Sequence, residues 1–163
     1  MKIVRFFLYP FALIYGGVMT IRNFLFDTGV LPSELHSLPI IAVGNLSMGG
    51  TGKSPHVEYL IRLLKRRAKI ATLSRGYGRK TSGFIEVAPT HSFLEVGDEP
   101  KVFKKNYSYL NVFVDANRNR GIRKIQELYP ETKCVILDDA FQHRSVKPGL
   151  SVLLTDYSKL YIK

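Results

Sequence analysis

The chain has 163 residues, of which 45% are hydrophobic and 12% aromatic. This length suits one domain with a hydrophobic core, and the composition excludes a disordered chain. The 24 Lys and Arg residues outnumber the 13 Asp and Glu residues and give a net charge of +11. The excess predicts an anionic partner, such as a nucleotide, a nucleic acid or an acidic membrane surface. The single cysteine, Cys134, excludes an intrachain disulfide and predicts a buried thiol in a reducing compartment.

An apolar segment lies near the start of the chain. Phe6 to Ile21 contains no charged residue, and Lys2, Arg5 and Arg22 flank it. As a helix the segment would extend about 24 Å, slightly less than the ~30 Å hydrocarbon core of a bilayer. It therefore predicts a membrane anchor helix over residues 1–26 that lies in the membrane or barely spans it. A buried core helix and a signal peptide are the alternatives, although no small-residue cleavage site follows the segment.

A glycine-rich loop from Gly44 to Ser54 follows the apolar run Pro39–Val43 and precedes the amphipathic segment Val57–Arg67. This order predicts a strand, a phosphate-binding loop and a helix. Glycines let backbone N–H groups approach phosphates, a lysine reaches the outer phosphates, and a hydroxyl binds Mg²⁺. Because Ser47 stands where the strict motif has a glycine, an ordinary glycine-rich turn is the alternative. The predicted nucleotide-binding residues are Gly49, Gly50, Thr51, Gly52, Lys53 and Ser54.

Further apolar runs alternate with amphipathic segments along residues 27–163. This alternation predicts one α/β/α three-layer domain with a mainly parallel sheet, resembling P-loop NTPases. The chain stops nine residues after Leu154 without a closing helix, so we expect a fragment or a truncated homologue. Expected strands after the loop are Lys69–Ser74, Leu110–Val114, Lys133–Leu137 and Leu150–Leu154, with a short arm at Gly83–Val87; expected helices follow Gly97 and span Gly121–Tyr129.

Acidic residues occur where two loops are expected. Asp138 and Asp139 follow a buried strand downstream of the phosphate loop, a position that places a carboxylate beside Mg²⁺. Asp98 and Glu99 lie in the turn Gly97-Asp-Glu-Pro100, where capping of a helix is the simpler alternative. His143 follows the acidic pair, and an acid/base or substrate-binding role competes there with a simple hydrogen bond.

Basic residues occur in the loop Arg75-Gly-Tyr-Gly-Arg-Lys80, at the expected carboxyl end of a strand. Ligands bind at this edge of open α/β sheets. A second basic group, on the helix Val57–Arg67, is by default a solvated face near a helix C-terminus. The first group is therefore the stronger candidate for binding an anionic ligand.

Four motifs, in this order, resemble the tetraacyldisaccharide 4'-kinase family, the lipid A kinases of Gram-negative bacteria. They are Gly44-Asn-Leu-Ser-Met-Gly-Gly-Thr-Gly-Lys-Ser-Pro55, Leu73-Ser-Arg-Gly-Tyr-Gly-Arg79, Val96-Gly-Asp-Glu-Pro100 and Leu137-Asp-Asp-Ala-Phe-Gln-His-Arg144. The resemblance implies a membrane-associated P-loop kinase that uses ATP and Mg²⁺. It implies transfer of the γ-phosphoryl group to the 4'-hydroxyl of a tetraacylated glucosamine disaccharide 1-phosphate, giving lipid IVA, at the cytoplasmic face of the inner membrane.

The resemblance also implies roles for individual residues. Lys53 would bind the ATP phosphates, and Asp98 would take the proton from the sugar hydroxyl. In this reading the catalytic residues are Asp98, Asp139 and Lys53, and the Mg²⁺ ligands are Ser54, Asp138, Asp139 and Glu99. Candidates for binding the acidic lipid headgroup are Arg75, Tyr77, Arg79, Arg120 and His143. Family members continue into a C-terminal part that completes the nucleotide site and contributes a histidine partner to the catalytic aspartate.

The expected partners are therefore the lipid A disaccharide 1-phosphate and an anionic inner-membrane surface, with no nucleic acid expected and no protein partner evident. Two rival functions are open. A membrane-tethered nucleotide-hydrolysing switch would consume ATP without a lipid acceptor. A nucleic-acid binder would show steep salt dependence and would leave Phe6 to Ile21 unexplained.

Overall fold

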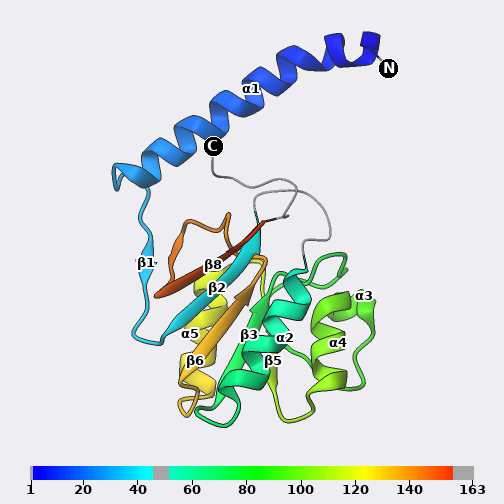
Figure 1. Ribbon diagram of the computed structural model, residues 1–163, viewed down its shortest axis with the longest axis vertical. Helices are drawn as coiled ribbons and strands as arrows, with labels where there is room; N and C mark the ends of the chain where they lie inside the picture. The colour runs from blue at the N-terminus through cyan, green and yellow to red at the C-terminus, as the bar shows by residue number, and fades with distance from the viewer. Residues whose placement is uncertain (1, 46–51, 156–163) are drawn as a thin grey trace. The chain divides into compact units, whose positions relative to one another are not determined.

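The computed structural model describes residues 2–45 and 52–155, with side chains described from Tyr9 onward (Figure 1). The chain divides into two compact units, Met1–Ser33 and Glu34–Lys163. The first unit contains α1 (Lys2–Asp27), and the second contains the sheet and the remaining helices.

α1 is one continuous helix of 26 residues with Pro10 inside it. Large hydrophobic side chains project from it with 57–69% of their surface exposed, namely Tyr9, Phe11, Leu13, Ile14, Tyr15, Val18, Ile21 and Phe24. Among the described residues, no helix combines the length and the apolarity that crossing a bilayer requires. The helix expected near the N-terminus is therefore present, and its apolar surface is uncovered within its own unit.

The second unit is built on a six-stranded sheet with the order β4-β5-β3-β6-β2-β8. All neighbouring strands are parallel except β4, which pairs antiparallel with β5. The strands are β2 (Ile40–Asn45), β3 (Ile70–Ser74), β4 (Ile85–Glu86), β5 (Asn111–Val114), β6 (Cys134–Asp138) and β8 (Leu150–Leu154). A separate parallel pair joins β1 (Glu34–Leu35) to β7 (Val146–Lys147). The mainly parallel sheet predicted from the alternating runs is confirmed.

Helices cover both faces of this sheet (Figure 1). On one face, Val57 and Ile61 of α2 (Lys53–Leu64) and Phe103 of α4 (Asp98–Asn106) share a core with alternate residues of the central strands. On the other face, Ile122 and Ile125 of α5 (Arg118–Leu128) pack in a second core. A one-turn helix, α3 (Phe93–Val96), precedes α4. Because side chains of a strand alternate between faces, the buried strands need both helical layers, which confirms the three-layer fold.

Two helices begin earlier than the hydrophobic pattern indicates. α2 begins at Lys53 instead of Val57, so the last residues of the phosphate-binding motif are helical. α5 begins at Arg118 instead of Gly121, because the side chain of Asn117 accepts a hydrogen bond from the Arg120 N–H and caps the helix. Polar first turns carry no apolar period, and capping therefore defines these starts better than periodicity does.

The strand order decides which loops meet. β5, β3, β6 and β2 are consecutive neighbours, and all four run parallel. Their carboxyl ends therefore lie along one edge of the sheet, which carries Asp115, Arg75, Asp139 and Asn45 in that order. Open parallel sheets bind ligands at this edge.

Candidate active site

The helix that follows the glycine-rich loop, α2, begins directly after Gly52. Gly52 is the N-cap residue and has φ 76°, in the left-handed region that glycine adopts without strain. Lys53 and Ser54 therefore occupy the first turn of α2, where unpaired N–H groups and the helix dipole favour an anion. Three further predicted nucleotide-binding residues lie outside the described part of the chain: Gly49, Gly50 and Thr51.

The Lys53 ammonium group bridges two strand ends. Its Nζ lies 3.2 Å from Asp139 Oδ1, and it donates a hydrogen bond of 3.2 Å to Asn45 Oδ1 at the end of β2. Asp139 has φ 50°, a conformation that residues other than glycine rarely adopt. This conformation places Asp139 in a sharp turn directly after β6, with 63% of its side chain exposed. The predicted catalytic residues Lys53 and Asp139 are thus in direct contact.

Ser54 and Glu99 meet across the site. Ser54 Oγ donates a hydrogen bond of 2.9 Å to Glu99 Oε1, and Glu99 lies in the first turn of α4. Asp138 is fully buried at the end of β6. Burial, and then the neighbouring carboxylates of Glu99 and Asp139, raise the pKa of Asp138 to about 8, whereas Lys53 lowers it. The structure therefore gathers several predicted Mg²⁺ ligands around a buried carboxyl group whose charged form is disfavoured overall.

The donor set fits a magnesium ion. Neither carboxylate oxygen of Asp138 has a hydrogen-bond partner among the described residues, although both are buried. A hard divalent cation would satisfy these oxygens, and Mg²⁺ usually takes only one or two protein carboxylates together with phosphate oxygens and water. Within the described residues, no three His, Cys, Asp or Glu side chains form a metal-binding group by themselves. Asp138, Glu99 and Ser54 Oγ are therefore the ligands that fit, while Asp139 is paired with Lys53.

Asp98 is the first residue of α4, and its side chain is exposed. Within the described part of the chain, it makes no hydrogen bond or ion pair that would occupy the carboxylate. Gly97 occupies the N-cap position, and Asp98 lies in the first helical turn, where a carboxylate also interacts favourably with the helix dipole. Gly97 packs backbone to backbone against Gly76: a Cβ on Gly97 would lie 2.9 Å from the Gly76 Cα. Asp98 is thereby held next to the basic loop after β3.

That basic loop lines a pocket of about 470 Å³. Arg79 crosses the loop and donates a hydrogen bond of 2.9 Å to the Gly83 carbonyl oxygen. Tyr77 is 88% exposed and so presents its ring to any ligand at the pocket. The lining residues are Arg75, Gly76, Tyr77, Gly78, Arg79, Thr81, Ser82, Gly83, Ala116 and Arg120. Four of the five predicted headgroup-binding residues therefore converge on one pocket.

The fifth, His143, does not line this pocket. It lies in the turn after β6, where its N–H donates a hydrogen bond of 2.9 Å to the Ala140 carbonyl oxygen. Phe141 in the same turn packs on Gly44: a Cβ at position 44 would lie 2.6 Å from the Phe141 Cβ. His143 is thus positioned by the turn that carries Asp139.

Asn45, Asp115 and Arg118 also lie at the site, although no sequence motif indicates a role for them there. Arg118 is only 2% exposed, and burial lowers its pKa to about 10, although Asp138, Asp139 and Asp115 favour its charged form. It donates a hydrogen bond to the Asp115 carbonyl oxygen. The positions of two of these residues in the sequence could have indicated them. Asp115 follows an apolar run in the same way as Asp138, and Arg118 follows directly after the helix cap Asn117.

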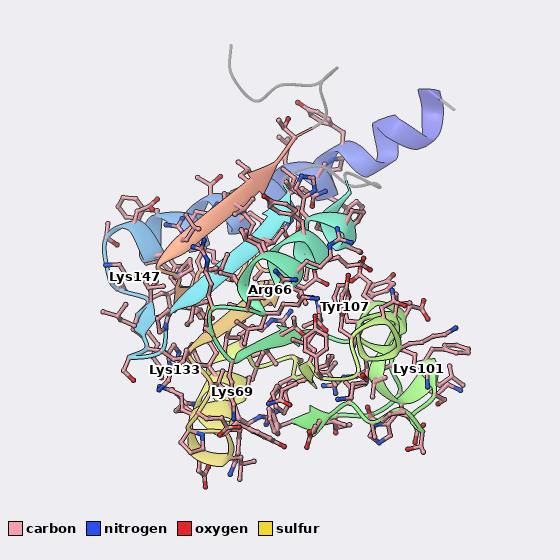
Figure 2. The ribbon with its side chains drawn as sticks, turned by 60° about the horizontal axis from the view of Figure 1, so that its bottom comes forward. Arg66, Lys69, Lys101, Tyr107, Lys133 and Lys147 are labelled. Atoms are coloured by element: carbon pink, nitrogen blue, oxygen red, sulfur yellow. The ribbon has the colours of Figure 1, made fainter. Side chains whose placement is uncertain are left out.

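A second hollow, of about 490 Å³, lies at the opposite edge of the sheet. Its lining includes Lys65, Arg66, Arg67 and Lys69 near the C-terminus of α2. Figure 2 shows Arg66, Lys69 and Lys133 on this side of the molecule. These cations suit the negative end of the helix dipole, and none of the predicted site residues is among them. The basic excess of the chain is therefore not confined to the candidate active site.

Comparisons with known proteins agree with one another on the family of this chain. The family described as "LpxK: Tetraacyldisaccharide-1-P 4'-kinase" matches residues 4–163. A tetraacyldisaccharide 4'-kinase of Flavobacterium psychrophilum is 52% identical over 162 residues, covering 99% of this chain and 47% of the relative. One from Bacteroides thetaiotaomicron is 49% identical over 155 residues, covering 94% of this chain and 41% of the relative. The chain spans about half the length of the curated relatives it matches.

A solved structure is also similar. The crystal structure of LpxK from Aquifex aeolicus in complex with ATP superposes with a TM-score of 0.86 at 37% identity, covering 95% of this chain and 50% of that one. Both the sequence and the fold agree over nearly all of the chain. The chain therefore belongs to the tetraacyldisaccharide-1-P 4'-kinase family.

Proposed function

We propose that this chain carries the phosphate loop and catalytic carboxylates of a kinase that transfers the γ-phosphoryl group of ATP to the 4'-hydroxyl of tetraacyldisaccharide 1-phosphate, giving lipid IVA. The observation that carries the proposal is the cluster in which Lys53 contacts Asp139 and Ser54 contacts Glu99, beside the buried Asp138. Curated relatives that bear this activity in their names are about twice as long, so the proposal concerns the catalytic half of such an enzyme.

ATP is the proposed phosphoryl donor. The first turn of α2 supplies N–H groups and a dipole for the phosphates, and Lys53 supplies a positive charge. The Lys53 ammonium group forms an ion pair with Asp139 and donates a hydrogen bond to Asn45, which hold it at the end of β2. The ATP complex of the similar Aquifex aeolicus protein supports this choice of donor.

Asp98 is the proposed base. Its carboxylate takes the proton of the 4'-hydroxyl while the hydroxyl oxygen forms a bond to the γ-phosphorus and the bond from that phosphorus to the bridging oxygen of ADP breaks. Lys53 and the loop amides neutralise charge on the phosphates during transfer. Ser54, Asp138 and Glu99 would hold Mg²⁺, which when bound supplies additional charge neutralisation.

The proposed acceptor is a lipid with an anionic headgroup. The pocket of about 470 Å³ lies beside the turn that carries Asp98, and three arginines line it. Arginine binds phosphate oxygens in a planar, two-point geometry. Arg75, Tyr77, Arg79 and Arg120 are therefore the proposed headgroup contacts.

The proposed site of action is the cytoplasmic face of the bacterial inner membrane. The apolar side chains of α1 are 57–69% exposed, and a monomeric water-soluble surface rarely presents so many large apolar groups together. An interfacial helix buries such a face in the headgroup region of a bilayer. We therefore propose that α1 docks the enzyme on the membrane surface, where its lipid acceptor resides.

ATP consumption with and without acceptor tests the kinase proposal. The chain is joined to the C-terminal half of the Flavobacterium psychrophilum relative and assayed in detergent micelles. A kinase consumes ATP at a rate that depends on tetraacyldisaccharide 1-phosphate. Equal rates with and without the lipid would contradict the proposal and favour the membrane-tethered nucleotide switch.

A further inference from the structure

The buried carboxylate of Asp115 accepts three hydrogen bonds. Its Oδ1 accepts hydrogen bonds of 2.8 Å from the Asn117 N–H and from Arg120 Nη2, and its Oδ2 accepts one of 2.8 Å from Arg120 Nε. The Asp115 N–H donates to the Ser74 carbonyl oxygen at 3.0 Å. The side chain is 0% exposed. Asp115 is therefore rigidly attached to the end of the sheet.

Arg120 has the opposite environment. It lies in the first turn of α5, its side chain is 48% exposed, and it lines the pocket of about 470 Å³. Only Nε and Nη2 face Asp115; Nη1 has no hydrogen-bond partner among the described residues. Gly121 allows this placement, because a Cβ there would lie 2.7 Å from Leu73 Cδ2. One edge of the guanidinium is thus anchored, and the other is available to a ligand.

The pocket is surrounded by more positive than negative charge. Arg75, Arg79 and Arg120 contribute three positive charges to the lining, and Asp115 offsets one of them. Burial lowers the pKa of Arg79, with Asp115 opposing this effect and Arg120 adding to it. Arg79 Nη1 is also buried without a hydrogen-bond partner among the described residues. The pocket therefore has an excess of two positive charges and unused donors, which matches a phosphate monoester of charge close to −2.

We propose that Asp115 is a positioning residue, which fixes Arg120 so that the pocket binds the phosphate monoester of the acceptor. The identity of that acceptor rests on the proposed function. A guanidinium held at two points loses little side-chain entropy when it binds a phosphate, whereas a free arginine must first be ordered. Asp115 would thus act on acceptor affinity and not on the chemistry of phosphoryl transfer.

The test uses this chain itself, titrated with glucosamine 1-phosphate as the probe and with glucosamine as its uncharged counterpart, followed by NMR. The variants are Asp115→Asn and Arg120→Gln, together with the double variant. Glu34→Gln is the matched control, because Glu34 also accepts two hydrogen bonds from an arginine, Arg123, at 2.7 Å each, but outside the pocket lining. Circular dichroism checks that each variant is folded.

We expect wild type and Glu34→Gln to bind the phosphosugar more tightly than glucosamine. Each single variant should weaken phosphosugar binding about tenfold or more, the usual effect of losing a charged hydrogen bond, and leave glucosamine binding unchanged. The double variant should be no weaker than the single ones, because both changes remove one shared interaction. A folded Asp115→Asn variant with wild-type affinity, or an additive double variant, would overturn the proposal.

Arg120→Lys gives a second test that does not disturb the buried carboxyl group. Lysine keeps the positive charge but cannot be held at two points. If positioning matters, this variant binds the phosphosugar nearly as weakly as Arg120→Gln; affinity equal to wild type would show that charge alone suffices and would refute the role of Asp115. The kinase assay is separate: absent phosphoryl transfer with intact phosphosugar selectivity refutes the proposed function only.

Discussion

Ser54 Oγ and Glu99 Oε1 form a hydrogen bond of 2.9 Å between residues that are 45 positions apart in the chain. The bond joins the first turn of α2 to the first turn of α4, which also carries Asp98. The phosphate-binding turn and the proposed base are therefore held in one framework before a ligand binds. Such preorganisation is the main contribution that a protein makes to phosphoryl transfer.

Replacing Lys53 with alanine should weaken ATP binding about tenfold or more, because the outer phosphates lose a charged partner. The measurement is isothermal titration calorimetry with Mg·ATP. Lys105→Ala is the control, since Lys105 is an exposed lysine of α4. Equal ATP affinity in wild type and Lys53→Ala would rule out the phosphate-binding role.

Replacing Asp98 with asparagine should lower kcat by roughly 10²- to 10⁴-fold, the usual contribution of a positioned general base. ATP affinity and Tm should change little, because the carboxylate has no partner within the described residues and Gly97 occupies the N-cap position. Steady-state kinetics of the joined protein with lipid acceptor provide the measurement. An asparagine variant with near wild-type kcat would exclude Asp98 as the base.

Charging the apolar surface of α1 should abolish binding to anionic vesicles. Ile14→Glu combined with Val18→Glu places two carboxylates at positions that are 65% and 57% exposed. Neighbours four residues apart lie on one side of a helix, so both charges face the same lipid surface. Co-sedimentation with phosphatidylglycerol vesicles measures the effect.

The matched control for this experiment is Leu63→Glu combined with Val102→Glu. These two apolar residues are each 46% exposed and lie in the second unit. The control should sediment with vesicles as wild type does. If the α1 variant also sediments fully, α1 is not the membrane-docking element.

Replacing Gly44 with alanine should destabilise the protein by about 1–3 kcal/mol, as overpacking a close contact usually does. The new Cβ would lie 2.6 Å from the Phe141 Cβ and 2.8 Å from its backbone nitrogen, so the turn after β6 must shift. Gly149→Ala is the control, because its Cβ would lie 3.6 Å from its nearest neighbour, the Ile40 carbonyl oxygen, an ordinary van der Waals distance. Urea unfolding curves with similar midpoints for both variants would contradict the close approach.

Much of the fold could be predicted, because the pattern of hydrophobic residues along the sequence indicates where the strands lie. The run Leu150–Leu154 matches β8 residue for residue, and the four buried strands β2, β3, β5 and β6 differ by one or two residues at their ends. Strands buried on both faces form continuous apolar runs, which are easy to recognise. Helix starts were less predictable, because Asn117 and Gly52 define them through capping and backbone conformation instead of hydrophobicity.

Site residues could be predicted from the sequence where they belong to a recognisable motif. Lys53, Ser54, Asp138 and Glu99 were assigned from their motifs, and they lie together at the carboxyl edge of the sheet. Asp115 and Arg118 were missed because their roles depend on which strands are neighbours. β5 lies beside β3 although its first residue, Asn111, is 37 positions after Ser74, the last residue of β3, and no local pattern reveals that pairing.

Formation of 4'-phosphorylated lipid tests the central claim most directly. The joined protein is incubated with tetraacyldisaccharide 1-phosphate and γ-labelled Mg·ATP, and the position of the label in the lipid is determined by mass spectrometry. The account predicts label at the 4'-position, strongly reduced by Asp98→Asn and by Lys53→Ala. Label that stays in inorganic phosphate, with no labelled lipid from folded and ATP-binding protein, would contradict it.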